Sequence, residues 1–240
     1  MKLIINADDF GLSKSITDGI IVGILGGYIT STTIMSNMDY AEYAIKQAIK
    51  NNISCIGLHI NLTVGRPIIK NSNLTDSNGI FLYNKNQIEN EKLTYEDVYN
   101  EINAQIEKIK EYGNDKIKID HLDFHHHLLS NDIIKKAALD IAKDLNIPVR
   151  NQNITNYKCP DILYRDFTIN NVNIDNLKQM ISKYNNKDIV VEIMTHPGYV
   201  DEYTKSITSY LGRENELNVL KEAKSIGLFN DIELISFSDF

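Results

Sequence analysis

Short apolar segments alternate with amphipathic segments along nearly the whole chain, and this alternation constrains the fold more than any other feature. We expect strands at the following segments: 2–7, 29–35, 54–62, 117–127, 147–152, 188–196 and 232–240. Helical spacing of apolar residues predicts helices at 13–28, 40–52, 94–113, 131–146, 173–185 and 213–227. Strands that alternate with helices pair in parallel. The sequence therefore predicts an α/β fold with a parallel sheet that is either closed into a barrel or open.

One domain accounts for the whole chain. A length of 240 residues can bury one substantial core, so we interpret residues 1–240 as a single domain. Hydrophobic residues make up 42% and charged residues 24%, which excludes the disordered and fibrous classes. Residues 63–92 are polar and lack periodicity, as expected of a long functional loop or lid.

The net charge and the first residues of the chain limit which partners and which cellular compartment we expect. A net charge of −7 without a dense basic cluster argues against nucleic acid and anionic membranes as partners. The start, MKLIINADDFGLS, reaches two carboxylates too early for a signal peptide, and no apolar run is long enough to cross a bilayer. The two cysteines, Cys55 and Cys159, do not suggest a disulfide framework. We therefore expect a cytoplasmic protein.

Carboxylates and imidazoles gather where four of the predicted strands end. Asp8 and Asp9 follow the first strand, and His59 and His196 lie late in the third and sixth. The fourth strand ends in KIDHLDFHHHLL, residues 118–129, which holds four of the chain's six histidines. Each histidine taken alone is more often structural than catalytic. Because the carboxyl ends of parallel strands meet at one face, however, we expect these groups to converge.

The histidine-rich window has a functional and a structural interpretation. If it is extended, His121, Asp123, His125 and His127 share one face of the strand. The structural alternative is a polar strand end whose histidines are satisfied by hydrogen bonds in the core. So many buried imidazoles rarely all find partners, which favours the functional interpretation.

Two histidines and one aspartate form the three-ligand set of a hydrolytic metal centre, with positions left for water and substrate. Imidazole favours zinc, cobalt, nickel or manganese, although a site with a carboxylate and several waters also accepts magnesium. We expect one divalent metal ion, either magnesium or zinc. Such a site also needs a base and an acid, and the second aspartate of the Asp8–Asp9 pair and His196 are the candidates.

Five stretches, in order along nearly the whole chain, resemble the motifs of the YdjC-like carbohydrate deacetylases, a family that includes chitooligosaccharide deacetylases. They are NADDFGLS, TSTT, GLHINLTVGRP, HLDFHHHLL and EIMTHPGYVD. One such motif alone would be weak evidence, but five in sequence are specific. The resemblance implies a distorted (β/α) barrel of about seven parallel strands, like that of polysaccharide deacetylases. It also implies a divalent metal held by an Asp-His-His set, and removal of acetyl groups from N-acetylated sugars such as diacetylchitobiose.

The resemblance assigns roles to five residues. Asp9, His59 and His125 would hold the metal, Asp8 would be the general base, and His196 would be the general acid or steady the oxyanion. The order of the two aspartates follows the wider deacetylase group, in which the first is the base. The residues alone leave that choice open.

Other residues would support the reaction. Arg150 would orient the base or bind substrate, with a surface ion pair as its structural alternative, and His127 would contact substrate. His121 and Asp123 would orient a ligating imidazole. The tyrosines at 199, 203 and 210, with the loop 63–92, would form the sugar cleft or simply pack at the barrel rim.

Two further functions compete with sugar deacetylation. A metal phosphoesterase would use the same ligands but needs cationic groups for the phosphoryl oxygens, and only Arg66 and Arg150 lie near motif ends. A non-catalytic sugar-binding protein would keep the metal and lose turnover, although both carboxylates and His196 are present. Relatives also suggest a homodimer, which no stretch of this sequence shows independently.

Overall fold

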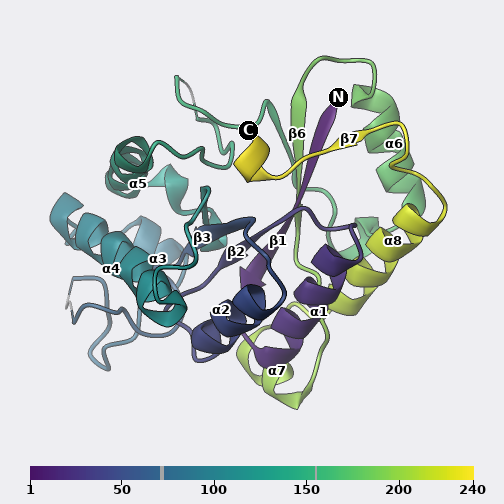
Figure 1. The fold of residues 1–240 in the computed structure, drawn as a ribbon. Helices are drawn as coiled ribbons and strands as arrows, with labels where there is room; N and C mark the ends of the chain where they lie inside the picture. Colours follow the sequence, from purple (N-terminus) through teal and green to yellow (C-terminus); the bar gives the residue numbers. More distant parts are fainter. Residues whose placement is uncertain (71–72, 155) are drawn as a thin grey trace.

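The computed structural model describes residues 1–70, 73–154 and 156–240, and its core is a curled parallel sheet (Figure 1). The strands run in the order β4-β3-β2-β1-β6-β5, and β7 pairs with the start of β1. Their bounds are β1 Lys2–Phe10, β2 Ser31–Ile34, β3 Ile56–Ile60, β4 Leu122–Phe124, β5 Ile162–Tyr164, β6 Val190–Thr195 and β7 Glu233–Leu234. All of these pairings are parallel, as the alternating pattern predicts.

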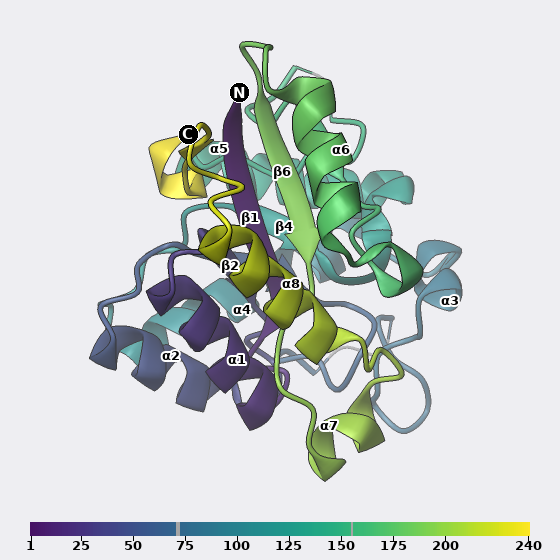
Figure 2. The same cartoon turned by 90° about the vertical axis from the view of Figure 1, so that its right-hand side faces the viewer.

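Helices surround the sheet (Figures 1 and 2). Their bounds are α1 Lys14–Leu25, α2 Ala41–Lys50, α3 Lys85–Ile88, α4 Tyr95–Gly113, α5 Asp132–Leu145, α6 Ile174–Tyr184, α7 Glu202–Ile207 and α8 Arg213–Ser225. The six helices expected from apolar spacing are confirmed. Thr94 and Asp97 form the capping box expected at the start of α4. The short helices α3 and α7 were not predicted, because one or two turns are too short to show a period.

The fourth strand is shorter than predicted, and this changes where its histidines point. β4 ends at Phe124, which pairs with Ile60, the last residue of β3. Among the described residues the pairing of β3 with β4 stops there, and the chain turns into a 3₁₀ helix, η1, at His125–Ser130. The prediction of an extended strand through residue 127, with one shared face, was therefore wrong.

The fifth predicted strand, 147–152, is also not a regular strand. Val149 alone forms an isolated parallel bridge, to Leu122. Pro148 lacks an N–H group, and the left-handed backbone of Asn153 (φ 62°) ends the extended path. The strand β5 lies later, at Ile162–Tyr164. Among the described residues β4 and β5 do not pair, so the sheet is a curled half-barrel rather than a closed one.

The chain end follows the same pattern of a short strand and a turn. β7 spans two residues, and the segment then forms a 3₁₀ helix, η3, at Phe237–Asp239. A further 3₁₀ helix, η2, lies at Ile169–Asn171. In the part of the chain that the structure describes, no helix combines the length and the apolar character needed to cross a bilayer.

Candidate active site

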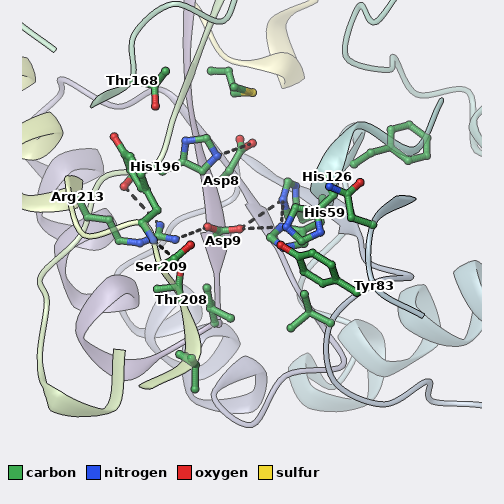
Figure 3. A pocket seen from close by; sticks show the side chains of 18 residues that line it. Asp8, Asp9, His59, Tyr83, His126, Thr168, His196, Thr208, Ser209 and Arg213 are labelled. Carbon is green, nitrogen blue, oxygen red and sulfur yellow. Dashed lines mark hydrogen bonds and ion pairs between the residues drawn. The ribbon is translucent and has the colours of Figure 1, made fainter. Parts of the chain in front are cut away.

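The carboxyl ends of β1, β3, β4 and β6 meet at one edge of the sheet, and a cavity of about 370 Å³ lies there (Figure 3). Asp8, Asp9, His59, His125 and His196 all line it. The structure therefore brings together the five residues expected to carry the chemistry. The volume lies in the range of small-molecule sites.

Asp8 and Asp9 both reach the cavity because β1 is irregular at its end. Successive side chains of a regular strand point to opposite faces. Here the register between β1 and β2 shifts between Ala7 and Phe10, and Asp9 has a left-handed backbone (φ 69°). Such a bulge re-aims a side chain, so two consecutive carboxylates face the same space.

Three donor atoms form a compact triangle at the cavity floor. Asp9 Oδ1 lies 3.5 Å from His59 Nε2 and 3.2 Å from His125 Nδ1, and the two imidazole nitrogens are 3.2 Å apart. Edges of about 3.3 Å suit donors that surround one cation at about 2.0–2.1 Å. Asp9 Oδ1 is buried and accepts no hydrogen bond from any described residue. The three residues therefore fit a divalent metal ion.

Asp123 orients His59 for this role. His59 Nδ1 lies 2.7 Å from Asp123 Oδ1, which leaves Nε2 facing Asp9 and His125. Burial opposes a charge on His59, but Asp123 and its neighbours outweigh burial and raise the pKa of His59 to about 10. Without metal the imidazole is protonated, and a cation would displace that proton.

A second group of possible donors, Asp8, His59 and Asp123, already has a cation of its own. Arg150 donates to Asp8 from Nη1 at 2.7 Å and from Nη2 at 2.6 Å, and its Nη2 lies 2.9 Å from Asp123 Oδ2. Its Nε donates to Glu192 at 2.7 Å. Because Arg150 already contacts both oxygens of Asp8 and one oxygen of Asp123, whereas Asp9 Oδ1 has no hydrogen-bond partner among the described residues, the Asp9 triangle is the better candidate for a metal site.

Arg150 is fully buried and does not line the cavity. Its position beside the base candidate Asp8, outside the cavity lining, favours the expected role of orienting the base over contact with substrate, and its ion pairs are buried rather than at the surface. Burial raises the pKa of Asp8, but the charge and hydrogen bonds of Arg150 outweigh burial and hold that pKa well below its usual range. Asp8 is therefore ionised at every ordinary pH.

His196 lies directly after β6, with Nε2 3.8 Å from Asp8 Oδ2. Its Nδ1 is buried and has no hydrogen-bond partner among the described residues. Burial lowers the pKa of His196 to about 4, more than the nearby carboxylates raise it. His196 is therefore neutral at pH 7.

Two residues of α8 contact the site, and the sequence did not single them out. Arg213 Nη2 donates to Asp9 Oδ2 at 2.6 Å. Glu216, one turn further on, accepts from the backbone N–H of His196 at 2.5 Å and from the hydroxyl of Tyr210. An arginine and a glutamate in the first turn of an amphipathic helix carry no local signal of a contact so distant along the chain.

The remaining expected residues divide between the cavity and the core. Tyr210 lines the cavity. We expected His121 to orient a ligating imidazole, but it contacts other groups. Its Nδ1 lies 2.5 Å from Asp120 Oδ1, and its ring stacks on Phe237. The side chain of His127 lies outside what the structure describes. His126 does line the cavity, where its Nδ1 lies 2.9 Å from the hydroxyl of Thr63.

Comparisons with known proteins find relatives that match nearly the whole chain. The family model of YdjC-like proteins matches residues 2–226. A carbohydrate deacetylase of Oceanobacillus iheyensis is 40% identical over 227 residues, which cover 92% of this chain and 96% of that protein. A carbohydrate deacetylase of Clostridium beijerinckii is 36% identical over 250 aligned positions that cover both chains completely.

A solved structure shows the same fold. The crystal structure of an Enterococcus faecalis V583 protein, proposed to cleave cellobiose phosphate, superposes with a TM-score of 0.89 at 29% identity. The match covers 99% of this chain and 98% of that one. The sequence motifs, the curled parallel sheet and these matches lead to one conclusion: the chain belongs to the YdjC-like protein family.

Proposed function

We propose that this protein is a metal-dependent carbohydrate deacetylase that removes acetyl groups from N-acetylated amino sugars and releases acetate. The observation that carries the proposal is the donor triangle of Asp9, His59 and His125, with Asp8 and His196 beside it in the same cavity. The names of the relatives support the sugar class.

Asp9, His59 and His125 would hold one divalent cation. Two imidazoles and one carboxylate favour zinc, while magnesium would require several additional water ligands. When bound, the cation supplies activation of a water molecule and polarisation of the acetyl carbonyl. The protein contributes the fixed donor geometry and the partly buried cavity.

Asp8 and His196 would move the proton. Asp8 is ionised and fixed by Arg150, so it can accept a proton from the attacking water. His196 Nε2 lies 3.8 Å from Asp8 Oδ2, so His196 would carry the proton that Asp8 takes up to the departing amine. The C–N bond breaks, and acetate and the free amino sugar leave.

The cavity favours an uncharged acetamido sugar over a phosphate ester. Among the described residues that line it, Arg213 is the one arginine or lysine, and Asp9 neutralises it. The phosphoryl oxygens of a phosphate ester would therefore find no free cation apart from the metal. Tyr210 also lines the cavity, and an aromatic ring there would suit the apolar face of a sugar. Diacetylchitobiose is the substrate we propose to test first.

Acetate release tests the function. Metal-loaded protein is incubated with diacetylchitobiose, beside a chelated sample and an Asp8→Asn variant. The proposal predicts acetate release that is lost in both controls. Equal release after full chelation, or none from any N-acetylated sugar by protein that has bound metal, would contradict it.

A further inference from the structure

The carboxylate of Asp9 has two oxygens, and either of them could face a cation in the proposed metal site. A carboxylate can bind a metal ion through one oxygen or through both. The choice changes the number of ligands and therefore which cation fits. The backbone of Asp9 places the side chain in the cavity, but it does not by itself distinguish Oδ1 from Oδ2.

The two oxygens have different partners (Figure 3). Oδ1 faces the imidazoles of His59 and His125 at 3.5 and 3.2 Å. Oδ2 accepts a 2.6 Å hydrogen bond from Arg213 Nη2 on the opposite side. A bond between two charged groups is among the stronger hydrogen bonds, and here both side chains are only 2% exposed. Oδ2 therefore already has a charged donor, and Oδ1 is the oxygen directed at the two imidazoles.

Arg213 is itself held in place. It is the first residue of α8, and its Nη1 donates to the backbone carbonyl of His196 at 3.4 Å. The guanidinium lies 5.6 Å from the ring centre of Tyr210, whose hydroxyl is bonded to Glu216. A buried, multiply contacted guanidinium keeps its position without metal, so the orientation of Asp9 is set before any cation arrives.

We propose that Arg213 is a positioning residue that makes Asp9 a one-oxygen metal ligand and so sets the affinity and coordination of the site. This inference rests on the proposed metal centre. Each of the two adjacent aspartates has its own arginine. Arg150 binds both oxygens of Asp8, and Arg213 binds one oxygen of Asp9.

The sign of the effect separates positioning from charge. A positive charge near the site repels a cation, so removing it would by itself strengthen metal binding. Loss of orientation would weaken binding, and loss of an outer partner of a ligand typically costs about 10- to 100-fold in metal affinity. If the charge of Arg213 dominated, Arg213→Met would bind the metal more tightly and Arg213→Lys, which keeps the charge, would bind it about as the wild type does. If orientation dominates, both variants bind the metal more weakly.

The test measures binding of Zn²⁺ by calorimetry and the visible spectrum of bound Co²⁺, without sugar. Variants are Arg213→Met, Arg213→Lys and, as a control, Lys221→Met, which removes a charge from an exposed position of the same helix. Circular dichroism and thermal unfolding of the metal-free proteins check the fold. Co²⁺ spectra report a change in coordination number, which a purely structural role would not produce.

We expect both Arg213 variants to bind Zn²⁺ about 10- to 100-fold more weakly than the wild type, with an altered Co²⁺ spectrum. Arg213→Lys should be the less affected, because it keeps one donor, and Lys221→Met should behave as wild type. Wild-type affinity and spectrum in Arg213→Met, or tighter binding with an unchanged spectrum, would overturn the inference. If the wild-type protein bound none of Zn²⁺, Co²⁺ and Mg²⁺, the metal centre itself would be refuted.

Discussion

Arg150 binds both carboxylate oxygens of Asp8, at 2.6 and 2.7 Å, although the two residues are 142 positions apart in the chain. Both side chains are almost completely buried. This pair keeps Asp8 ionised and fixes its orientation beside Asp9. In the function we propose, the two neighbouring aspartates have separate tasks: Asp8 acts as the base and Asp9 as a metal ligand.

Asp8→Asn should abolish most turnover and spare the metal. The amide cannot accept a proton, and loss of a general base typically costs about 10²- to 10⁴-fold in rate. Because Asp8 is not in the donor triangle, bound Zn²⁺ should stay at one ion per chain. Steady-state kinetics and metal analysis of the same preparation check both parts. Full activity would remove Asp8 from the mechanism, and loss of metal would reverse the assignment of the two aspartates.

Arg150→Met should destabilise the fold strongly. The guanidinium compensates the buried carboxylates of Asp8, Asp123 and Glu192, and removing one partner of such a cluster typically costs about 3–5 kcal/mol. Urea unfolding measures the loss. The exposed Arg165 supplies the control, since Arg165→Met should stay within about 0.5 kcal/mol of wild type. An equally small change in Arg150→Met would show that the cluster does not depend on its cation.

Metal addition should stabilise the protein through the donor triangle. A ligand that binds only the folded state adds about 2.7 kcal/mol at 100 times its Kd. Zn²⁺ should therefore raise the unfolding temperature of the wild type and fail to raise that of His125→Ala. The next residue provides a matched control: His126 lines the cavity but is not in the triangle, so His126→Ala should keep the increase. The reverse pattern would place the metal elsewhere.

Glu216 should make stability depend on pH. Burial raises the pKa of Glu216 to about 8, against 4.5 as its ordinary value, despite its hydrogen bonds to Tyr210 and His196. The contribution of Glu216 to the free energy of unfolding is fully present below pH 4.5, because Glu216 is then protonated in both the folded and the unfolded state. As pH rises towards 8 the unfolded chain loses a proton that the folded protein keeps, so this contribution is lost.

Glu216→Gln cannot ionise and should lose less stability than the wild type between pH 5 and pH 8. Urea unfolding at both pH values measures the difference. The exposed Glu222 of the same helix serves as control, since Glu222→Gln should follow the wild-type curve. Parallel pH curves for Glu216→Gln and the wild type would show that Glu216 keeps its ordinary pKa.

The sequence predicts the six long helices and the meeting of the candidate site residues at one face of the sheet. Helical periods of about three turns or more identify α1, α2, α4, α5, α6 and α8. Asp8, Asp9, His59 and His196 lie at or just after strand ends in sequence, and parallel topology necessarily brings such ends together.

What the sequence did not predict depends on distant partners. β4 ends at Phe124 because its neighbour β3 ends at Ile60, which no local pattern shows. Arg213 meets Asp9 across 204 positions, and only the tertiary fold, in which α8 packs against α1, brings the two side chains together. Arg150 was recognised from its motif position, but its three carboxylate partners come from β1, β4 and β6.

The most direct test of metal-dependent deacetylation is to titrate the metal-free protein with Zn²⁺ and to measure acetate release from diacetylchitobiose. We expect no acetate without metal, a linear rise up to one Zn²⁺ per chain, and no rise in the Asp8→Asn variant. Acetate release that is independent of Zn²⁺, or its absence when one Zn²⁺ per chain is bound, would contradict a metal-dependent deacetylase.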